Sequence, residues 1–377
     1  MAEISGTWEE RFSPVVERLR RHLDEGLDVG ASVSVTVDGE FVVDIWGGHA
    51  DEARTRRWER DTIVNTWSLT KTMTAMCALV LADRGELDLW SPVARYWPEF
   101  AAGGKQSVEV RHLLGHTAGL AGWTEPVAAE DLADWEKMTA LLAAQEPWWE
   151  PGTQSGYHAL TQGYLVGEVV RRITGTTLGR FFAAEVAGPL GADYAVGLPA
   201  GDDARVAPVI PPETPRVSSS STSVAARTLR NPRLRGTEPQ APWWRRAEIP
   251  AANGQGNARS VARVQSVLAC GGEVDGVRLL SPRGCEVVFD EQANGTDLVL
   301  GPGFRLGMGY GLASDLVPIG PRACFWGGWG GSIVIIDLEA RLVVCYVMNK
   351  MAAALTGDTR GGAIALSALR ALVRRPG

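Results

Sequence analysis

Residues 69–84 (LTKTMTAMCALVLADR) constrain the fold of this chain more than any other stretch. As a helix, the segment is apolar nearly all round, with threonines and Lys71 as its few polar residues before the final Asp-Arg pair. A helix without a polar face belongs in a protein core. A membrane span is not expected, because the sequence contains no run of about 18 apolar residues. Gly85 is the expected residue at the C-terminal end of this helix.

β-Strand signals lie near both ends of the chain. Residues 31–48 alternate valines with polar residues, turn at Asp38-Gly39 and continue into a second apolar run, which predicts a β-hairpin. Further strand signals lie at residues 305–314, 323–328 and 332–349, the last again with the pattern of a hairpin. One sheet built from both ends of the chain is the simplest arrangement that these strands allow.

Helical patterns fill the middle of the chain and flank the strands. Residues 86 to about 197 are mostly helical with loops, and the helix that follows Tyr157 is expected to end at Gly175. Two further helices are predicted at residues 257–270 and 359–375. We therefore predict an α+β fold, an α/β arrangement of two domains. Residues 1–85 and 252–377 form the discontinuous sheet domain, and residues 86–251 form a mainly helical inserted domain with a long loop near 199–223.

The N-terminal residues 1–26 are polar and lack the apolar h-region of a secretory signal, so we expect an amphipathic first helix and no export. Five scattered cysteines have no metal-type spacing, which indicates buried free thiols and a cytoplasmic protein without a bound metal. They are Cys77, Cys270, Cys285, Cys324 and Cys345.

The net charge of −7 argues against general affinity for nucleic acid. One local basic stretch, residues 227–236 (RTLRNPRLRG), is followed by PWWRR, and a solvated loop is favoured there over a site for a polyanion. Lysine occurs only at positions 71, 105, 137 and 350, which makes a motif built on lysine more informative.

Ser68 and Lys71 form such a motif at the start of the apolar helix. Their i, i+3 spacing places both on one face, and a serine nucleophile needs a base within hydrogen-bond reach. A buried lysine loses its proton more easily, and the N-terminus of the helix favours a developing oxyanion near Ser68. The alternative is a capping serine and a surface lysine. The helix offers no polar face for a surface lysine, which favours the catalytic interpretation.

In this context the chain resembles the serine β-lactamase and penicillin-binding-protein superfamily. The resemblance covers about residues 10–370, and its closest branch is the family VIII carboxylesterases, which resemble class C β-lactamases in fold. It implies the β-lactamase/DD-peptidase-like fold, an antiparallel sheet flanked by helices. Besides Ser68-x-x-Lys71, it rests on LLGHTAGL at 113–120, PGTQSGYHALTQGYLVGEVVRRITG at 151–175, and FWGGWGGS at 325–332.

The resemblance also implies roles for individual residues. Tyr157 shares the base role with Lys71, whose positive charge would favour the Tyr157 phenolate. The backbone N–H groups of Ser68 and Trp329 form an oxyanion hole. Surrounding glycines let that strand approach the substrate closely.

Two departures from the lactamase pattern bear on the substrate. Where lactamases have Tyr-x-Asn, this chain has Tyr157-His158-Ala159, and an alanine cannot bond a substrate amide. Where they have a cation or a hydroxyl for a carboxylate, it has Trp326-Gly327-Gly328, which we expect to form an apolar substrate-binding surface. Both changes favour neutral, apolar esters. His158 could contact the same pocket or serve an orienting or structural role.

We therefore predict a serine carboxylesterase that hydrolyses short- to medium-chain acyl esters through an acyl-enzyme on Ser68. It needs no cofactor, and its partner is a small-molecule ester rather than nucleic acid or a membrane; no oligomeric state is predicted. Within the superfamily, the alternatives are a β-lactamase, an amidase or D-amino-acid peptidase, and a non-catalytic acyl-binding relative. Outside it, a Ser-His-Asp hydrolase would use His116 or His158 but lacks G-x-S-x-G. A zinc site at His112 and His116 lacks the essential glutamate.

Overall fold

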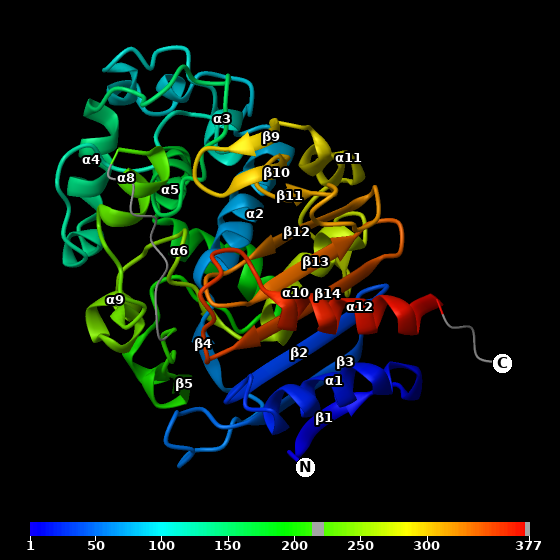
Figure 1. Ribbon diagram of the computed structural model, residues 1–377. Coiled ribbons are helices and arrows are strands. Elements are labelled where there is room, and N and C mark those ends of the chain that lie inside the picture. The colour runs from blue at the N-terminus through cyan, green and yellow to red at the C-terminus, as the bar shows by residue number, and fades with distance from the viewer. Residues whose placement is uncertain (213–221, 374–377) are drawn as a thin grey trace.

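A large antiparallel sheet joins the two ends of the chain, as the sequence predicts (Figure 1). The computed structural model describes residues 1–212 and 222–373, and within them the sheet has nine strands in the order β1-β3-β2-β14-β13-β12-β11-β10-β9. The N-terminal hairpin meets the C-terminal one where β2 pairs with β14. The strands are β1 Ile4–Trp8, β2 Gly30–Val37, β3 Glu40–Gly48, β9 Ala293–Asp297, β10 Gly301–Leu306, β11 Gly311–Leu312, β12 Ala323–Gly327, β13 Ile333–Asp337 and β14 Leu342–Met348.

The hairpin predicted at residues 31–48 is confirmed as β2 and β3. Asp38 and Gly39 both have positive φ angles, 53° and 86°, as a two-residue turn of this kind requires. The polar residues that alternate along β2 are buried rather than solvated, because helix α10 (Ala258–Ala269) covers them. Thr36 Oγ1 lies 2.8 Å from Ser266 Oγ, and Ser32 Oγ accepts the backbone N–H of Ala258.

Helices cover both faces of the sheet. Helices α1 (Ser13–Asp24) and α12 (Thr359–Val373) pack against each other and against β3 and β14, whereas α10 packs on the opposite face against β2, β13 and β14. Figure 1 shows α1 and α12 in front of the sheet. The helices predicted at residues 257–270 and 359–375 are thus confirmed over their described residues.

The apolar helix predicted from residue 69 is α2, Thr70–Asp83, and it follows a short 3-10 turn, Trp67–Leu69. Every α2 residue from Thr70 to Leu81 is buried, and α5 (Thr161–Thr174) and α6 (Leu178–Phe182) pack on it. Gly85 follows with a φ of 75°, the left-handed conformation expected after a helix end. Burying each large apolar side chain of α2 contributes roughly 1.5–3 kcal/mol, which fixes the helix in the core.

The prediction of one helix at the N-terminus is wrong for residues 4–8. These residues form β1, which pairs with β3 from Ile4 opposite Gly47 to Trp8 opposite Val43. The pairing depends on Gly6, whose φ is 111° and where a Cβ atom would collide with the carbonyl oxygen of Asp44. A long-range ladder therefore overrides the local pattern, and the helix begins only at Ser13, with Pro14 in its first turn.

Between the two halves of the large sheet the chain forms helices joined by long loops, and the helical inserted domain and its boundaries stay a prediction. A small sheet, β5-β4-β6, joins Ile63–Asn65 (β4) to Val206–Ala207 (β5) and Gln255–Gly256 (β6). Of the long loop predicted near 199–223, residues 213–221 lie outside the described residues. The other elements are α3 Val110–Leu114, α4 Trp135–Ala144, α7 Gly188–Leu190, α8 Val224–Arg230, α9 Pro242–Arg246, β7 Glu273–Val274, β8 Val277–Arg278 and α11 Pro282–Glu286.

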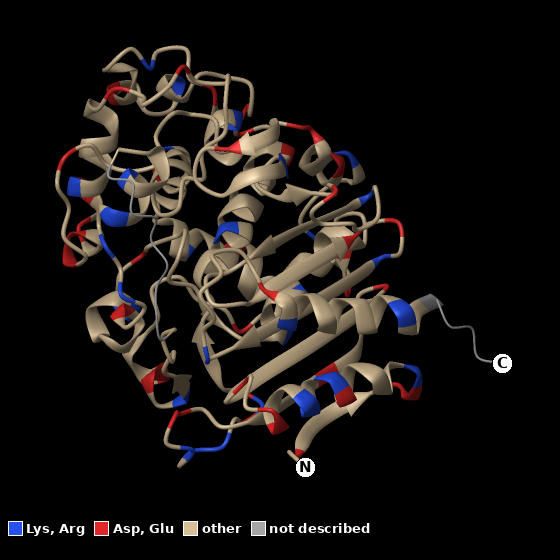
Figure 2. Cartoon of the chain, viewed as in Figure 1, with Lys and Arg blue, Asp and Glu red and all other residues tan. Residues whose placement is uncertain are grey.

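Charged residues of both signs are interspersed over the outer helices and loops in the view of Figure 2, while the strands of the large sheet are mostly uncharged. All five cysteines are buried free thiols, as predicted. None of the helices in residues 1–212 and 222–373 combines the length and the apolar character that a membrane-spanning helix needs. The cytoplasmic location stays a prediction.

Candidate active site

Ser68, Lys71 and Tyr157 meet at the N-terminal end of α2. Tyr157 lies in the loop before α5, and its hydroxyl is 2.5 Å from Ser68 Oγ. Lys71 Nζ is 3.3 Å from the same Ser68 oxygen and 4.7 Å from the centre of the Tyr157 ring. The structure therefore brings together the three residues that the sequence predicts to be catalytic, although they lie 89 positions apart at the widest.

Lys71 is fully buried, and burial lowers its pKa well below the ordinary value for a lysine. Its Nζ donates to the backbone carbonyls of Ala159, at 2.7 Å, and Ala251, at 2.9 Å. A neutral amine has two hydrogens, and these two carbonyls take both. The nitrogen lone pair then remains for the third neighbour, Ser68 Oγ. The site can therefore hold Lys71 as a base that accepts the serine proton.

Burial raises the pKa of the Tyr157 phenol above its ordinary value, so Tyr157 keeps its proton. Hydrogen bonding to Ser68 and the nearby indole of Trp326 oppose this effect without reversing it. The buried carboxylate of Asp297 raises the same pKa further. These directions contradict the expectation that a Lys71 cation supports a Tyr157 phenolate, because neither group is stabilised in its charged form when buried.

Asp297, which sequence reasoning missed, positions the loop that carries Tyr157. Its Oδ1 accepts the backbone N–H of Tyr157 at 3.0 Å and those of Val299 and Leu300 at 2.9 Å. The bond from the Val299 N–H closes a local turn that an aspartate commonly makes with the residue two positions ahead. The sequence alone could have indicated this turn. The bond to Tyr157 spans 140 positions and leaves no local signal.

The residue before Ser68 has a strained backbone. Trp67 has a φ of 51°, a left-handed conformation that is unusual for a residue with a bulky side chain. Its indole packs against Trp244 and Trp329, with ring centres 5.6 Å and 4.7 Å away. Because surrounding contacts must hold such a conformation in place, these tryptophans fix the direction in which Ser68 presents its hydroxyl.

Buried hydroxyl groups fasten the same turn to the neighbouring chain. Thr66 Oγ1 lies 2.6 Å from the Tyr194 hydroxyl, which donates to Thr70 Oγ1 at 3.3 Å. Thr70 Oγ1 in turn accepts the backbone N–H of Gly254 at 2.8 Å. Every hydroxyl in this group has a partner, so the group rigidifies the backbone on both sides of Ser68.

Two backbone N–H groups point to an oxyanion hole. Within the described chain, neither the N–H of Ser68 nor that of Trp329 has a hydrogen-bond acceptor, and both residues line the same pocket. Gly328 allows the chain that carries Trp329 to lie close to the turn that carries Ser68, because a Cβ atom at Gly328 would lie 2.5 Å from the carbonyl oxygen of Thr66. The end of β12 thus approaches the turn before α2 without a side chain between them.

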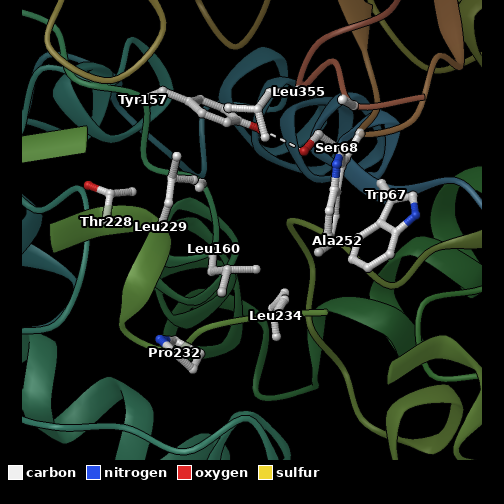
Figure 3. Close-up of a pocket in the computed structure, with 13 residues that line it drawn as sticks. Trp67, Ser68, Tyr157, Leu160, Thr228, Leu229, Pro232, Leu234, Ala252 and Leu355 are labelled. Atoms are coloured by element: carbon white, nitrogen blue, oxygen red, sulfur yellow. Dashed lines mark hydrogen bonds between the residues drawn. The ribbon is translucent and has the colours of Figure 1, made fainter. Parts of the chain in front are cut away.

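An apolar pocket opens over Ser68 (Figure 3), and its empty space of about 760 Å³ includes part of the open solvent at its mouth. Figure 3 shows Leu160, Leu229, Leu234 and Leu355 around the space beside the Ser68–Tyr157 pair. None of the described residues that line it is charged. They are Trp67, Ser68, Tyr157, Ala159, Leu160, Thr228, Leu229, Pro232, Leu234, Ala252, Trp329, Ala353 and Leu355.

The residues predicted to bind substrate divide into two groups. Trp329 lines the pocket, whereas Trp326, Gly327 and Gly328 are not among the described residues that line it. Trp326 is buried beside Tyr157, with ring centres 5.8 Å apart. His158 is fully buried, with Nδ1 bonded to the Gly156 carbonyl and Nε2 to the Leu120 N–H. Burial lowers the pKa of His158 to about 3, and this arrangement favours the structural role that the sequence left open.

The basic stretch at residues 227–236 contributes a wall of the pocket, which sequence reasoning missed. Leu229, Pro232 and Leu234 face the cavity, while Arg227 lies over the Trp148 ring with its guanidinium carbon 3.8 Å from the ring centre. The arginines dominate the composition of this stretch and conceal the apolar residues between them. A second missed contribution comes from Ala353 and Leu355.

The histidines do not form the rival sites. In the described structure, the side-chain partners of Ser68 Oγ are Lys71 and Tyr157 rather than a histidine. His112 caps α3 by accepting the Glu109 N–H, and no group of three or more His, Cys, Asp or Glu among the described residues could hold a metal ion. The ring of His116 instead stacks on Trp326 beside Tyr157.

Comparison with known proteins shows the family to which the chain belongs. The family model described as Beta-lactamase matches residues 19–369. The chain belongs to the β-lactamase family. The esterase/beta-lactamase LipL of Mycobacterium tuberculosis is 34% identical over 96% of this chain and 87% of its own length. Within this serine β-lactamase-like superfamily, the chain is a hydrolase.

Two solved structures are similar over nearly the whole chain. A family VIII carboxylesterase is 43% identical, with a TM-score of 0.93, and the match covers 98% of this chain and 100% of that one. A penicillin-binding protein homolog from Caulobacter crescentus is 35% identical, with the same TM-score of 0.93 and the same coverage. The predicted fold, an antiparallel sheet flanked by helices in the β-lactamase arrangement, is confirmed.

Proposed function

We propose that this hydrolase is a carboxylesterase that cleaves short- to medium-chain acyl esters through an acyl-enzyme on Ser68. The observation that carries the proposal is the Ser68–Tyr157–Lys71 cluster at the base of a pocket with no charged residue in its described lining. Its relatives named as esterases support the same reaction class.

Acylation begins when Lys71, as a neutral amine, takes the proton of Ser68 while Oγ attacks the ester carbonyl. The N–H groups of Ser68 and Trp329 stabilise the resulting oxyanion. Tyr157 keeps its own proton and lies 2.5 Å from Ser68 Oγ, which becomes the ester oxygen of the intermediate. It is therefore placed to protonate the leaving alkoxide, and the proton that Lys71 took from Ser68 replaces the one that Tyr157 gives, so both groups are neutral again in the acyl-enzyme. Water attacks the acyl-enzyme in the second half, and the same groups exchange roles.

The pocket supports esters rather than penicillin-like acids as the proposed substrates. Ala159 lines it, and an alanine side chain cannot bond a substrate amide. The lining offers no cation within its described residues for a carboxylate, which would lose its hydration without compensation. Leu160, Leu229 and Leu234 offer apolar contact to a substrate chain instead.

A second activity, slow β-lactam hydrolysis, follows from the same acylation groups. The name of the relative LipL, esterase/beta-lactamase, joins both activities. A β-lactam ring presents a reactive carbonyl to Ser68, but its carboxylate would meet the apolar wall. We therefore expect slow turnover of nitrocefin and much faster turnover of esters.

The test is steady-state hydrolysis of p-nitrophenyl esters from acetate to octanoate, alongside nitrocefin, by the wild type and Ser68→Ala. We expect repeated turnover that peaks at a short or medium chain and is lost in the variant. A single burst without turnover would support a non-catalytic acyl-binding protein. Efficient nitrocefin hydrolysis with weak ester hydrolysis would contradict the argument from Ala159 and the uncharged lining.

A further inference from the structure

The loop of residues 328–331, which carries Trp329, has a backbone that few sequences adopt. Gly330 and Gly331 have φ angles of 97° and 128°, both in the region that favours glycine. Backbone bonds hold the loop on either side of Trp329, from the Gly328 N–H to the Ser332 carbonyl and from the Gly330 N–H to the Ala354 carbonyl. The Trp329 N–H itself has no acceptor among the described residues, so its direction depends on these neighbours.

One buried side chain reaches this loop from α12. Arg360 is 7% exposed, and its Nη2 donates to the carbonyl oxygen of Gly330 at 2.5 Å. A Cβ atom at Gly331 would lie 2.6 Å from the same nitrogen, so the glycine makes room for the guanidinium. The contact fixes the Gly330–Gly331 peptide, whose carbonyl also accepts the Ala352 N–H at 2.8 Å, and so helps to hold the loop that carries Trp329.

The rest of the guanidinium is anchored in the sheet domain. Nη1 donates to Asp28 Oδ1 at 2.7 Å and to the carbonyls of Leu27 and Lys350 at 3.0 Å and 2.9 Å. Nε donates to Asp358 Oδ2 at 2.8 Å. The planar guanidinium presents its donors in a fixed fork, so these partners together set where Nη2 points.

We propose that Arg360 is a positioning residue for the oxyanion hole, acting through Gly330 on the N–H of Trp329. This inference rests on the proposed function, because it assigns Trp329 to the stabilisation of an ester-derived oxyanion. A donor that is already aimed costs no reorganisation when charge develops in the transition state. Loss of this orientation of the Trp329 N–H therefore lowers kcat more than it raises KM.

The experiment compares Arg360→Met, Arg360→Lys and Asp28→Asn with a matched control, Arg259→Met. Arg259 is also largely buried and pairs with Asp44 at 2.7 Å, but it does not line the pocket over Ser68. Two quantities are measured: kcat and KM for p-nitrophenyl butyrate, and the inhibition constant of a trifluoromethyl ketone, which forms a tetrahedral oxyanion adduct with a serine. Melting temperatures are recorded for all variants.

We expect Arg360→Met to lower kcat by about 30- to 100-fold and to weaken ketone inhibition by a similar factor, with KM changed less than about threefold. Arg360→Lys should lose less, and Asp28→Asn least, in the same two quantities. If Arg360→Met does not fold, the other two variants decide. The control should lower the melting temperature with kcat unchanged.

The proposal is overturned if folded Arg360 variants keep full kcat, or if they raise KM while ketone affinity is unchanged. It is also overturned if the control loses as much kcat for the same fall in melting temperature. Failure of the proposed function would look different, because the wild type itself would then not turn over the ester in a Ser68-dependent way.

Discussion

The structure contains two buried lysines in different regions, and only one has the surroundings of a base. Lys71, in α2, donates to two carbonyls and faces the Ser68 hydroxyl, whereas Lys105, in the helical segment, donates to the three carbonyls of Ala102, Ala143 and Gln145. Both are fully buried beside an aromatic ring. Burial lowers the pKa of Lys105 to about 8, so it stays mostly charged at neutral pH, and lowers that of Lys71 well below the ordinary value.

The two lysines differ in the depth of burial and in the kind of acceptor that surrounds them. Burial alone lowers the pKa of Lys71, which is the more deeply enclosed of the two, whereas the carboxylate of Glu146 opposes the fall in the pKa of Lys105. Three carbonyls match the three hydrogens of an ammonium group, so the environment of Lys105 compensates the charge that burial penalises. Two carbonyls and a hydroxyl match an amine with a free lone pair. Deeper burial, together with a hydroxyl in place of the third carbonyl, therefore gives Lys71 the surroundings of a base.

The largest effect is expected when Ser68, the partner that distinguishes Lys71 from Lys105, is removed. Ser68→Ala should lower kcat/KM for p-nitrophenyl butyrate by about 10⁴-fold or more, because no nucleophile is left for Lys71 to activate. The melting temperature should stay close to that of the wild type. Substantial Ser68-independent turnover would place the chemistry elsewhere in the molecule.

Replacing each lysine in turn by methionine tests the comparison of the two lysines directly. Lys71→Met should lower kcat/KM by about 10³–10⁴-fold as the base is lost. Lys105→Met should leave kcat/KM per folded molecule within about threefold of the wild type. It should instead destabilise the fold by about 2–4 kcal/mol, because three buried carbonyls lose their donor. Denaturant titration measures the stability of both variants, and ester kinetics measure their activity. Equal losses of activity in the two variants would contradict the distinction between a catalytic Lys71 and a structural Lys105.

A matched pair of tyrosines sharpens the comparison further. Tyr157→Phe should lower kcat by about 10²–10³-fold, because the leaving alkoxide loses its acid. Tyr164→Phe removes an equally buried hydroxyl that donates to the Leu132 carbonyl at 2.6 Å, far along the chain from Ser68. That control should cost about 1 kcal/mol of stability and leave kcat unchanged. Normal kcat in Tyr157→Phe would remove tyrosine from the mechanism.

The smallest effect concerns stability and pH. Where a folded lysine is neutral but its unfolded counterpart is protonated, the folded state gains stability as pH rises, by about 1.4 kcal/mol per pH unit. The stability of the wild type relative to Lys71→Met should therefore rise with pH up to the unfolded pKa of about 10.4. For Lys105→Met, the same rise should begin only near pH 8.

Denaturant titrations from pH 6 to 9.5 measure both slopes. The comparison predicts that the rise for Lys71 begins at a lower pH than the rise for Lys105. Coincident pH dependences would mean that the two lysines bind their protons equally well when folded.

Local patterns predicted the elements that depend on short-range sequence. The turn at Asp38-Gly39, the apolar helix that begins beside Ser68, and the i, i+3 relation of Ser68 and Lys71 each follow from a few neighbouring residues. The fold as a whole was predicted from the positions of these elements and from the resemblance to the superfamily. The exception, β1, depends on pairing with a strand some 40 positions later.

The features that the sequence did not reveal all depend on contacts between distant segments. The bond from Asp297 to the Tyr157 backbone and the carbonyls around Lys71 come from loops that meet only in the folded chain. The apolar wall at Leu229 and Leu234 is hidden among arginines, whose charged ends need not face the cavity that their neighbours line. The resting proton of Lys71 depends on how deeply the folded chain buries its amine and on which acceptors surround it, and no local pattern records either.

The most direct test of the central claim is the mass of the intact protein after exposure to an activated phosphonate ester. The wild type and Lys105→Met should each gain one phosphonyl group, Ser68→Ala none, and Lys71→Met should react far more slowly. Peptide mapping should place the group on Ser68. An adduct of the same size and rate in Ser68→Ala would contradict the account, because the nucleophile would then lie outside the cluster of Ser68, Lys71 and Tyr157.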